Sequence, residues 1–82
     1  MQQEKSVQSV ERCFALLEQL AQRGSAAVTE LAAATGLHKA TVHRLLATLQ
    51  GLGYVRQAGQ GGPYTLTLKL LQLSSGSLQC FS

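Results

Sequence analysis

Four side chains that can carry positive charge or form hydrogen bonds stand close together near the middle of the chain: Lys39, Thr41, His43 and Arg44. At about 100° per residue, a helix over 38–52 places part of this group opposite an apolar sector. The apolar sector holds Val42, Leu45, Leu46, Leu49 and Leu52, and the opposite face holds Ala40, His43, Arg44 and Ala47. Arginine and lysine bind guanine edges or phosphate, whereas hydroxyl and imidazole groups bond a base edge or a backbone oxygen. We therefore expect this face to contact double-stranded DNA, through Lys39, Ala40, Thr41, His43, Arg44 and Thr48.

A short helix and a tight turn precede this segment and must hold it in place. Thr29 is expected to cap the short helix, with Glu30 favourable to the positive end of its dipole. The turn is expected at Gly36, because a short connection between crossed helices needs a positive φ that other residues reach only with strain. The longer helix is expected to end at Gly51 and Gly53. These features predict a helix-turn-helix over 29–53.

An amphipathic helix is expected earlier, from Val7 to about Gln22, with Ser6 or Ser9 as its cap and Gly24 at its end. Its apolar residues recur at helical spacing, and we expect them to form one buried stripe: Val10, Cys13, Phe14, Leu17, Leu20 and Ala21. Val7 and Leu16 lie near or off the edge of that stripe. They are either ordinary surface apolar residues or contacts with a second subunit.

Two β-prone segments follow the helix-turn-helix, over 54–58 and 63–67, around the glycine-rich turn 59–62. This pattern predicts a hairpin, with Pro63 at the start of an edge strand and Arg56 as its only cation. A further helix is expected over 68–73, with an extension to Leu78 across Gly76 left open. The predicted fold is mainly α with a small β-hairpin: a winged helix-turn-helix with a three-helix core, a two-stranded wing and a C-terminal linker helix.

The composition agrees with one small domain that faces a polyanion. The 82 residues leave room for one core, and no apolar stretch approaches the length of a membrane span or a signal peptide, so we expect a cytoplasmic chain. All four acidic residues precede position 31, whereas four cations follow it. This asymmetry suits a nucleic-acid surface, although an ordinary solvated surface would look the same.

Catalytic and metal-binding functions find little support, so we expect no enzyme, no cofactor and no metal. No serine, cysteine or carboxylate has a histidine partner at a suitable spacing. His38 and His43 would lie about 140° apart on a helix, which is unsuited to a shared metal. Cys13 is expected to be a buried apolar residue and Cys80 an incidental tail residue, without a disulfide.

Three stretches resemble the IclR family of bacterial transcription factors in its N-terminal DNA-binding domain: SVQSVERCFALLEQL, VTELAAATGLHKATVHRLLATLQGLGYV and GGPYTLTLKLLQL. The resemblance implies a dimer, or a higher oligomer, on a palindromic operator, with the first helix contributing to dimerisation. It also implies that a small-molecule effector acts through a larger C-terminal domain absent from this chain. The departures are His38, where the family often has proline, and Ala40, where it often has serine, which removes one hydrogen bond to DNA.

We expect the chain to divide into a flexible N-terminal arm (1–6), a winged helix-turn-helix DNA-binding domain (7–67), and a linker helix and tail (68–82) that lead toward the effector domain implied by the resemblance. An alternative function is a winged helix that acts as a protein–protein interaction module and does not bind DNA. In that case the polar face of the longer helix is merely solvated, and the leucine-rich C-terminal segment docks a protein partner. Dependence on salt separates the two hypotheses, because only binding to a polyanion weakens steeply as salt rises.

Overall fold

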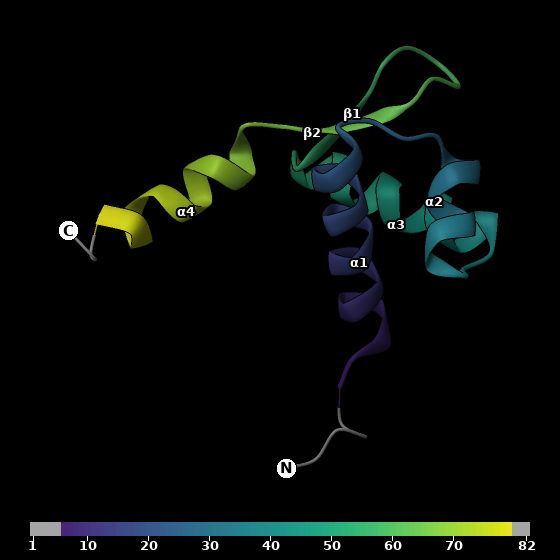
Figure 1. The fold of residues 1–82 in the computed structure, drawn as a ribbon, viewed down its shortest axis with the longest axis horizontal. Coiled ribbons are helices and arrows are strands. Elements are labelled where there is room, and N and C mark those ends of the chain that lie inside the picture. Colours follow the sequence, from purple (N-terminus) through teal and green to yellow (C-terminus); the bar gives the residue numbers. More distant parts are fainter. Residues whose placement is uncertain (1–5, 80–82) are drawn as a thin grey trace.

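The computed structural model describes residues 6–79, which form helices and one hairpin (Figure 1). In chain order the elements are α1 (Gln8–Arg23), α2 (Val28–Thr35), α3 (Lys39–Leu52), β1 (Val55–Gln57), β2 (Tyr64–Leu66) and α4 (Lys69–Gln79). This order confirms the predicted winged helix-turn-helix. The expectations for the arm over 1–5 and for Cys80 lie outside the described residues.

Helix α1 packs on the core through a face that only partly matches the expected stripe: Leu17 and Leu20 are buried as predicted, whereas Ala21 is exposed. Its buried residues are Leu16, Leu17 and Leu20, whereas Val10 and Phe14 are more than half exposed. The prediction that Leu16 lies at a subunit contact was wrong, because its side chain is fully enclosed by this chain's own core. The expected serine cap was also wrong: Val7 is the N-cap, with no side-chain hydrogen bond.

Helices α2 and α3 form the helix-turn-helix around a left-handed turn. Gly36 has φ +75° and donates its amide to the Ala32 carbonyl at 2.9 Å, so the predicted turn is confirmed. The prediction for Thr29 was wrong, because α2 begins one residue before it and the N-cap is Ala27. The Ala27 amide donates to Glu30 Oε1 at 2.9 Å, so a carboxylate fixes this helix start from inside the first turn.

The core lies where α1, α2 and α3 meet the base of the hairpin. Its members are apolar residues and one tyrosine: Leu16, Leu17, Leu20, Ala26, Leu31, Val42, Leu45, Leu46, Leu49, Val55 and Tyr64. Helix α3 contributes four of them, which confirms the predicted apolar sector except for Leu52, whose side chain is 54% exposed at the end of the helix. The opposite face of α3 therefore remains free for contacts.

The hairpin is an antiparallel pair in which Val55 lies opposite Leu66 and Gln57 opposite Tyr64. Ala26 joins its edge through two backbone hydrogen bonds with Tyr64, of 3.1 and 2.8 Å. The short segment between α1 and α2 is thus fixed to the wing. Pro63 directly precedes β2, as expected for a residue without an amide hydrogen.

Helix α4 extends away from the three-helix core (Figure 1). It continues through Gly76 to Gln79, so the longer of the two expected lengths is confirmed. No described helix has the length and apolar character needed to span a membrane.

Candidate nucleic-acid interface

The exposed face of α3 carries the residues that the sequence singled out. Lys39, Ala40, His43 and Arg44 are exposed, and Thr41 is half-buried. His38 precedes the helix as its N-cap in an extended conformation, so Lys39 and Ala40 occupy the first turn. Polar and basic side chains therefore gather on the first two turns, which is where a helix that enters the major groove meets base edges.

The second half of the same face carries small side chains. Ala47 and Gly51 are exposed and carry little or no side chain, so a surface could approach the backbone closely there. Thr48 is exposed, but its hydroxyl donates to the Arg44 carbonyl at 3.2 Å. Its oxygen can still accept a hydrogen bond, so its role as a donor to DNA is weaker than the sequence indicated.

The wing offers one exposed cation and a tightly closed tip. Arg56 is exposed on β1, opposite Thr65 in the register. At the tip, the Gln57 side-chain amide donates to the Gly62 carbonyl at 3.0 Å. A Cβ at Gly62 would lie only 2.0 Å from the Ala58 carbonyl oxygen, so this position requires glycine. The tip is therefore a tight turn with a defined conformation, and Gln60 is exposed on it.

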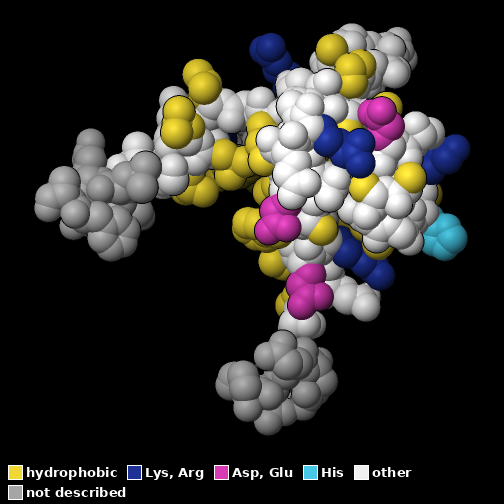
Figure 2. All heavy atoms as spheres, in the orientation of Figure 1, with side chains coloured by type: hydrophobic (Ala, Val, Ile, Leu, Met, Phe, Trp, Pro, Cys, Tyr) yellow, Lys and Arg dark blue, Asp and Glu magenta, His cyan; other side chains and the backbone are white. Residues whose placement is uncertain are grey.

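Charges are distributed unevenly over the surface. Figure 2 shows carboxylates along α1 and near α2, whereas Lys and Arg side chains are spread singly over the visible face and do not form one dense patch. Since only four lysines and arginines follow position 31, the helix-turn-helix and wing of one copy offer few cations to a polyanion. Among residues 6–79 no group of three or more histidine, cysteine or acidic side chains could hold a metal ion.

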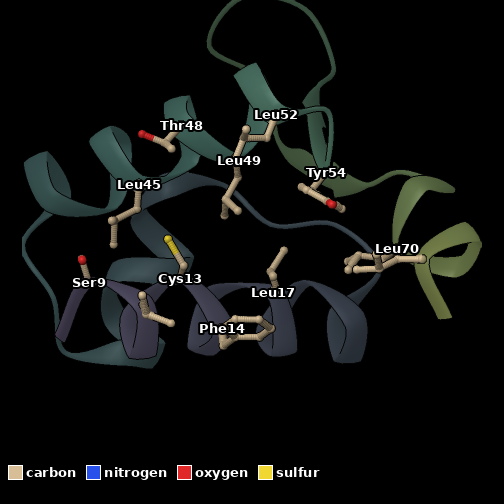
Figure 3. A pocket seen from close by; sticks show the side chains of 12 residues that line it. Ser9, Cys13, Phe14, Leu17, Leu45, Thr48, Leu49, Leu52, Tyr54 and Leu70 are labelled. Carbon is tan, nitrogen blue, oxygen red and sulfur yellow. The ribbon is translucent and has the colours of Figure 1, made fainter. Parts of the chain in front are cut away.

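A second surface feature is an apolar groove between α1, the second half of α3 and α4, and it shares Thr48 with the expected DNA-contacting residues. Its volume is about 450 Å³, and the side chains in Figure 3 converge on it from both walls. The residues that line it are Ser9, Val10, Cys13, Phe14, Leu17, Leu45, Thr48, Leu49, Leu52, Tyr54, Leu70 and Leu73. Burial raises the pKa of the Cys13 thiol, consistent with the apolar residue we expected there.

The groove was not predicted from the sequence, because the helical spacing of α1 indicated that Val10 and Phe14 are buried in the core. The only signal in the sequence was that the apolar residues of α1 cover more than one stripe. A helix with apolar residues on two adjacent faces can bury only one of them against a small core, and the periodicity does not say which.

The element order, the glycine turn and the exposed polar face of α3 define a winged helix-turn-helix domain, a class that commonly contacts DNA through the second helix of the motif. Residues 9–59 match the model of the IclR helix-turn-helix domain. The chain belongs to the IclR family.

Two curated relatives illustrate the match. The chain is 42% identical over 77 residues to the HTH-type transcriptional regulator KdgR of Dickeya chrysanthemi, a match that covers 94% of this chain and 25% of that protein. It is 45% identical over 74 residues to the transcriptional repressor IclR of Escherichia coli (strain K12), covering 89% of this chain and 27% of that protein. The chain thus spans about a quarter of the length of these relatives. They are transcriptional regulators, in agreement with our expectation of a protein that is not an enzyme.

Solved structures agree with the fold. An IclR family transcriptional regulator from Brucella abortus superposes with a TM-score of 0.84 at 32% identity, covering 96% of this chain and 30% of that one. The Zalpha domain of Carassius auratus PKZ, solved in complex with Z-DNA, has a TM-score of 0.70 at 24% identity, covering 74% of this chain and 100% of that one. The second likeness shows the shared winged-helix fold alone.

Proposed function

We propose that this chain binds double-stranded DNA sequence-specifically as part of a transcriptional regulator, with α3 in the major groove. The observation that carries the proposal is the division of α3 into two faces. Val42, Leu45, Leu46 and Leu49 are buried, whereas the basic and polar side chains of the first two turns are exposed. Family membership and the names of the matched regulators support the same function.

Within this proposal each exposed residue has a role that its chemistry suits. Arg44 makes a two-pronged contact with guanine or clamps a phosphate, and Lys39 binds a phosphate or guanine. Thr41 and His43 bond a base edge or a backbone oxygen. Ala40 and Thr48 contact the DNA surface by close approach, and Arg56 of the wing binds a phosphate.

Selection of duplexes from a random pool, followed by titration at several salt concentrations, tests this proposal. We expect Arg44→Ala to weaken binding to the selected duplex by about 1–3 kcal/mol. Arg23→Ala is the matched control, because Arg23 is an exposed arginine at the end of α1 that bonds Gln19. Equal affinities for the two variants would contradict the assignment of α3 as the DNA-contacting helix. Binding that does not change with salt would favour the protein-docking alternative.

We further propose that two copies bind a palindromic operator as a homodimer. Each copy presents few cations, so pairing two α3 helices about 34–36 Å apart adds both affinity and symmetry. The apolar groove and the exposed Val7, Val10 and Phe14 of α1 supply a surface that water solvates poorly. This extends the expected contact at Val7 along α1 and replaces the one at Leu16.

Sedimentation equilibrium tests the dimer. Phe14→Glu places a charge in the groove, and we expect it to make the chain monomeric. Leu68→Glu is the matched control, since Leu68 is an exposed leucine outside the groove lining. A wild-type chain that stays monomeric up to the highest soluble concentration would contradict the proposal.

The domain organisation is part of the proposal. Residues 7–67 would form the DNA-binding unit and 68–82 a linker, after the N-terminal arm 1–6. The matched relatives are about four times as long as the aligned segment. A small-molecule effector would act through a domain outside this chain, in a bacterial cytoplasm where the regulator meets DNA.

A further inference from the structure

Three consecutive backbone carbonyls, that of the last residue of α3 and those of the two residues after it, accept hydrogen bonds from the segment that leads into α4. Lys69 Nζ donates to the Leu52 carbonyl at 2.6 Å, and Thr67 Oγ1 donates to the Gly53 carbonyl at 2.6 Å. The Thr67 amide donates to the Tyr54 carbonyl at 3.0 Å. We call these contacts between Leu52–Tyr54 and Thr67–Lys69 the α3–α4 junction. The contact with Leu52 satisfies a carbonyl group that the end of a helix leaves without an intrahelical partner.

The positive charge of Lys69 stabilises the C-terminal end of α3, whereas the same charge near the N-terminal end of its own helix, α4, is destabilising. A cation is stabilising near a helix C-terminus and destabilising near an N-terminus. Lys69 is the first residue of α4, yet its ammonium group donates to the carbonyl of Leu52, the last residue of α3. Helix α3 has no basic residue in its own last turn, so Lys69 supplies the missing charge.

Two neighbours hold the lysine side chain in this position. Its ammonium group lies 4.9 Å from the centre of the Tyr54 ring, within the range of a cation–π contact. A Cβ at Gly53 would lie 3.4 Å from Lys69 Cδ and 3.5 Å from Nζ, which is ordinary van der Waals contact, so the lysine side chain packs against this residue. The φ of +93° at Gly53 is the feature that favours glycine there.

Thr67 connects the two helices through one hydroxyl group. Its Oγ1 donates to the Gly53 carbonyl after α3 and accepts from the Lys69 amide at the start of α4, the latter at 3.2 Å. The same oxygen therefore ends one helix and begins the next. A displacement of the first turn of α4 must break these bonds or move the end of α3 with it.

We propose that Lys69 is a positioning residue that couples the orientation of α4 to the DNA-contacting helix α3. Its ammonium group stays on the Leu52 carbonyl of α3, so it makes no phosphate contact of its own. Through this junction, movement of the segment that follows the winged helix changes the presentation of Lys39, His43 and Arg44. This inference rests on the proposed DNA binding by α3.

The test compares Lys69→Met with Lys69→Arg in the whole chain, using a duplex that the wild-type chain selects from a random pool. Methionine keeps the apolar stem but cannot bond the carbonyls, whereas arginine keeps the charge, the donors and the contact with an aromatic ring. We expect Lys69→Met to weaken binding about three- to tenfold, and Lys69→Arg to stay within about twofold of wild type. Amide exchange at the end of α3 should accelerate only in Lys69→Met.

Salt dependence separates positioning from direct contact. Removing a phosphate contact lowers the slope of log affinity against log salt by about one, whereas removing a positioning residue leaves it unchanged. A lowered slope in Lys69→Met, unchanged affinity, or equal losses in both variants would overturn the inference. Thr67→Val should weaken binding and Thr67→Ser should not; equal binding by these two would also count against the junction.

The proposed function can fail separately. If the wild-type chain selects no duplex, or Arg44→Ala binds as wild type does, DNA binding through α3 is wrong. If Arg44→Ala weakens binding while Lys69→Met does not, α3 contacts DNA without control from the junction.

Discussion

The apolar sector of α3 holds one leucine in the core and another in the open groove, so the same substitution at the two positions tests how deeply each part of this sector is buried. Leu46 is fully buried, whereas Leu52, six residues further along, is 54% exposed. We expect Leu46→Ala to destabilise the chain by about 3–5 kcal/mol, because the lost transfer free energy of the side chain adds to that of the cavity left behind. Leu52→Ala should cost about 1 kcal/mol, since only part of its surface is withdrawn from water.

The difference is large against the stability available to a chain of this size. At about 0.05–0.15 kcal/mol per residue, 82 residues give a total free energy of unfolding of about 4–12 kcal/mol. Each kcal/mol shifts the Tm of a domain this small by about 4–8 °C. Leu46→Ala should therefore lower the Tm by more than about 12 °C and Leu52→Ala by less than about 8 °C.

Thermal unfolding followed by far-UV circular dichroism measures this difference directly, since most described residues are helical and the chain has no tryptophan. Both variants make the same change in helix propensity, so it largely cancels in the comparison. Well below its Tm, Leu46→Ala should still bind the selected duplex, because the side chain faces away from the DNA. Equal Tm shifts for the two variants would refute the burial of Leu46 in the core and the exposure of Leu52 at the end of α3.

Three further outcomes follow from local geometry. Gly36→Ala should cost about 1–2 kcal/mol through its positive φ, whereas Gly51→Ala should gain about 0.5–1 kcal/mol in thermal unfolding, since no atom lies near either added Cβ. Glu30→Ala should lower the free energy of unfolding in urea by about 1 kcal/mol, because the Ala27 amide loses its carboxylate acceptor. Glu30→Gln keeps an oxygen that can accept this bond, so its loss of stability should be smaller, and equal losses in the two variants would contradict the capping role of this side chain. Because burial raises the pKa of Cys13 in the folded chain, its contribution to stability is present at low pH and is lost as pH rises through the raised value. In a Cys80→Ser variant the Cys13 thiol should accordingly alkylate more slowly in the folded chain than in urea, and equal rates would contradict its burial.

Local rules predicted the helix-turn-helix well. Leucine and valine at helical spacing specify which side of α3 is buried, because one continuous apolar stripe admits a single orientation against a core. Glycine at position 36 specifies the turn, because other residues reach its φ of +75° only with strain. The hairpin followed from two β-prone segments around glycines. Each of these signals is contained within about one turn or one strand of sequence.

The start of α2 shows where local rules were insufficient. Thr29 is a favourable capping residue, but the backbone amide and the backbone carbonyl of Ala26 are both hydrogen-bonded to Tyr64 in the wing. That long-range pairing fixes the chain just before α2, so the helix begins at Val28 and Glu30 takes over the capping of Ala27. The capping preference of threonine, worth about 1 kcal/mol, is outweighed here by backbone pairing with a strand almost forty positions away in the sequence.

By itself, the sequence determined the order of elements, the turn at Gly36, the buried sector of α3 and the family, because these depend on residues close together in the chain. Only the tertiary structure decided which apolar face of α1 enters the core, and so left Val10 and Phe14 to line a groove. It also decided that Lys69, one of the four cations that follow position 31, donates to the Leu52 carbonyl at the end of α3. Both outcomes depend on how separate helices cross, and helical periodicity carries no information about the partner that each face meets.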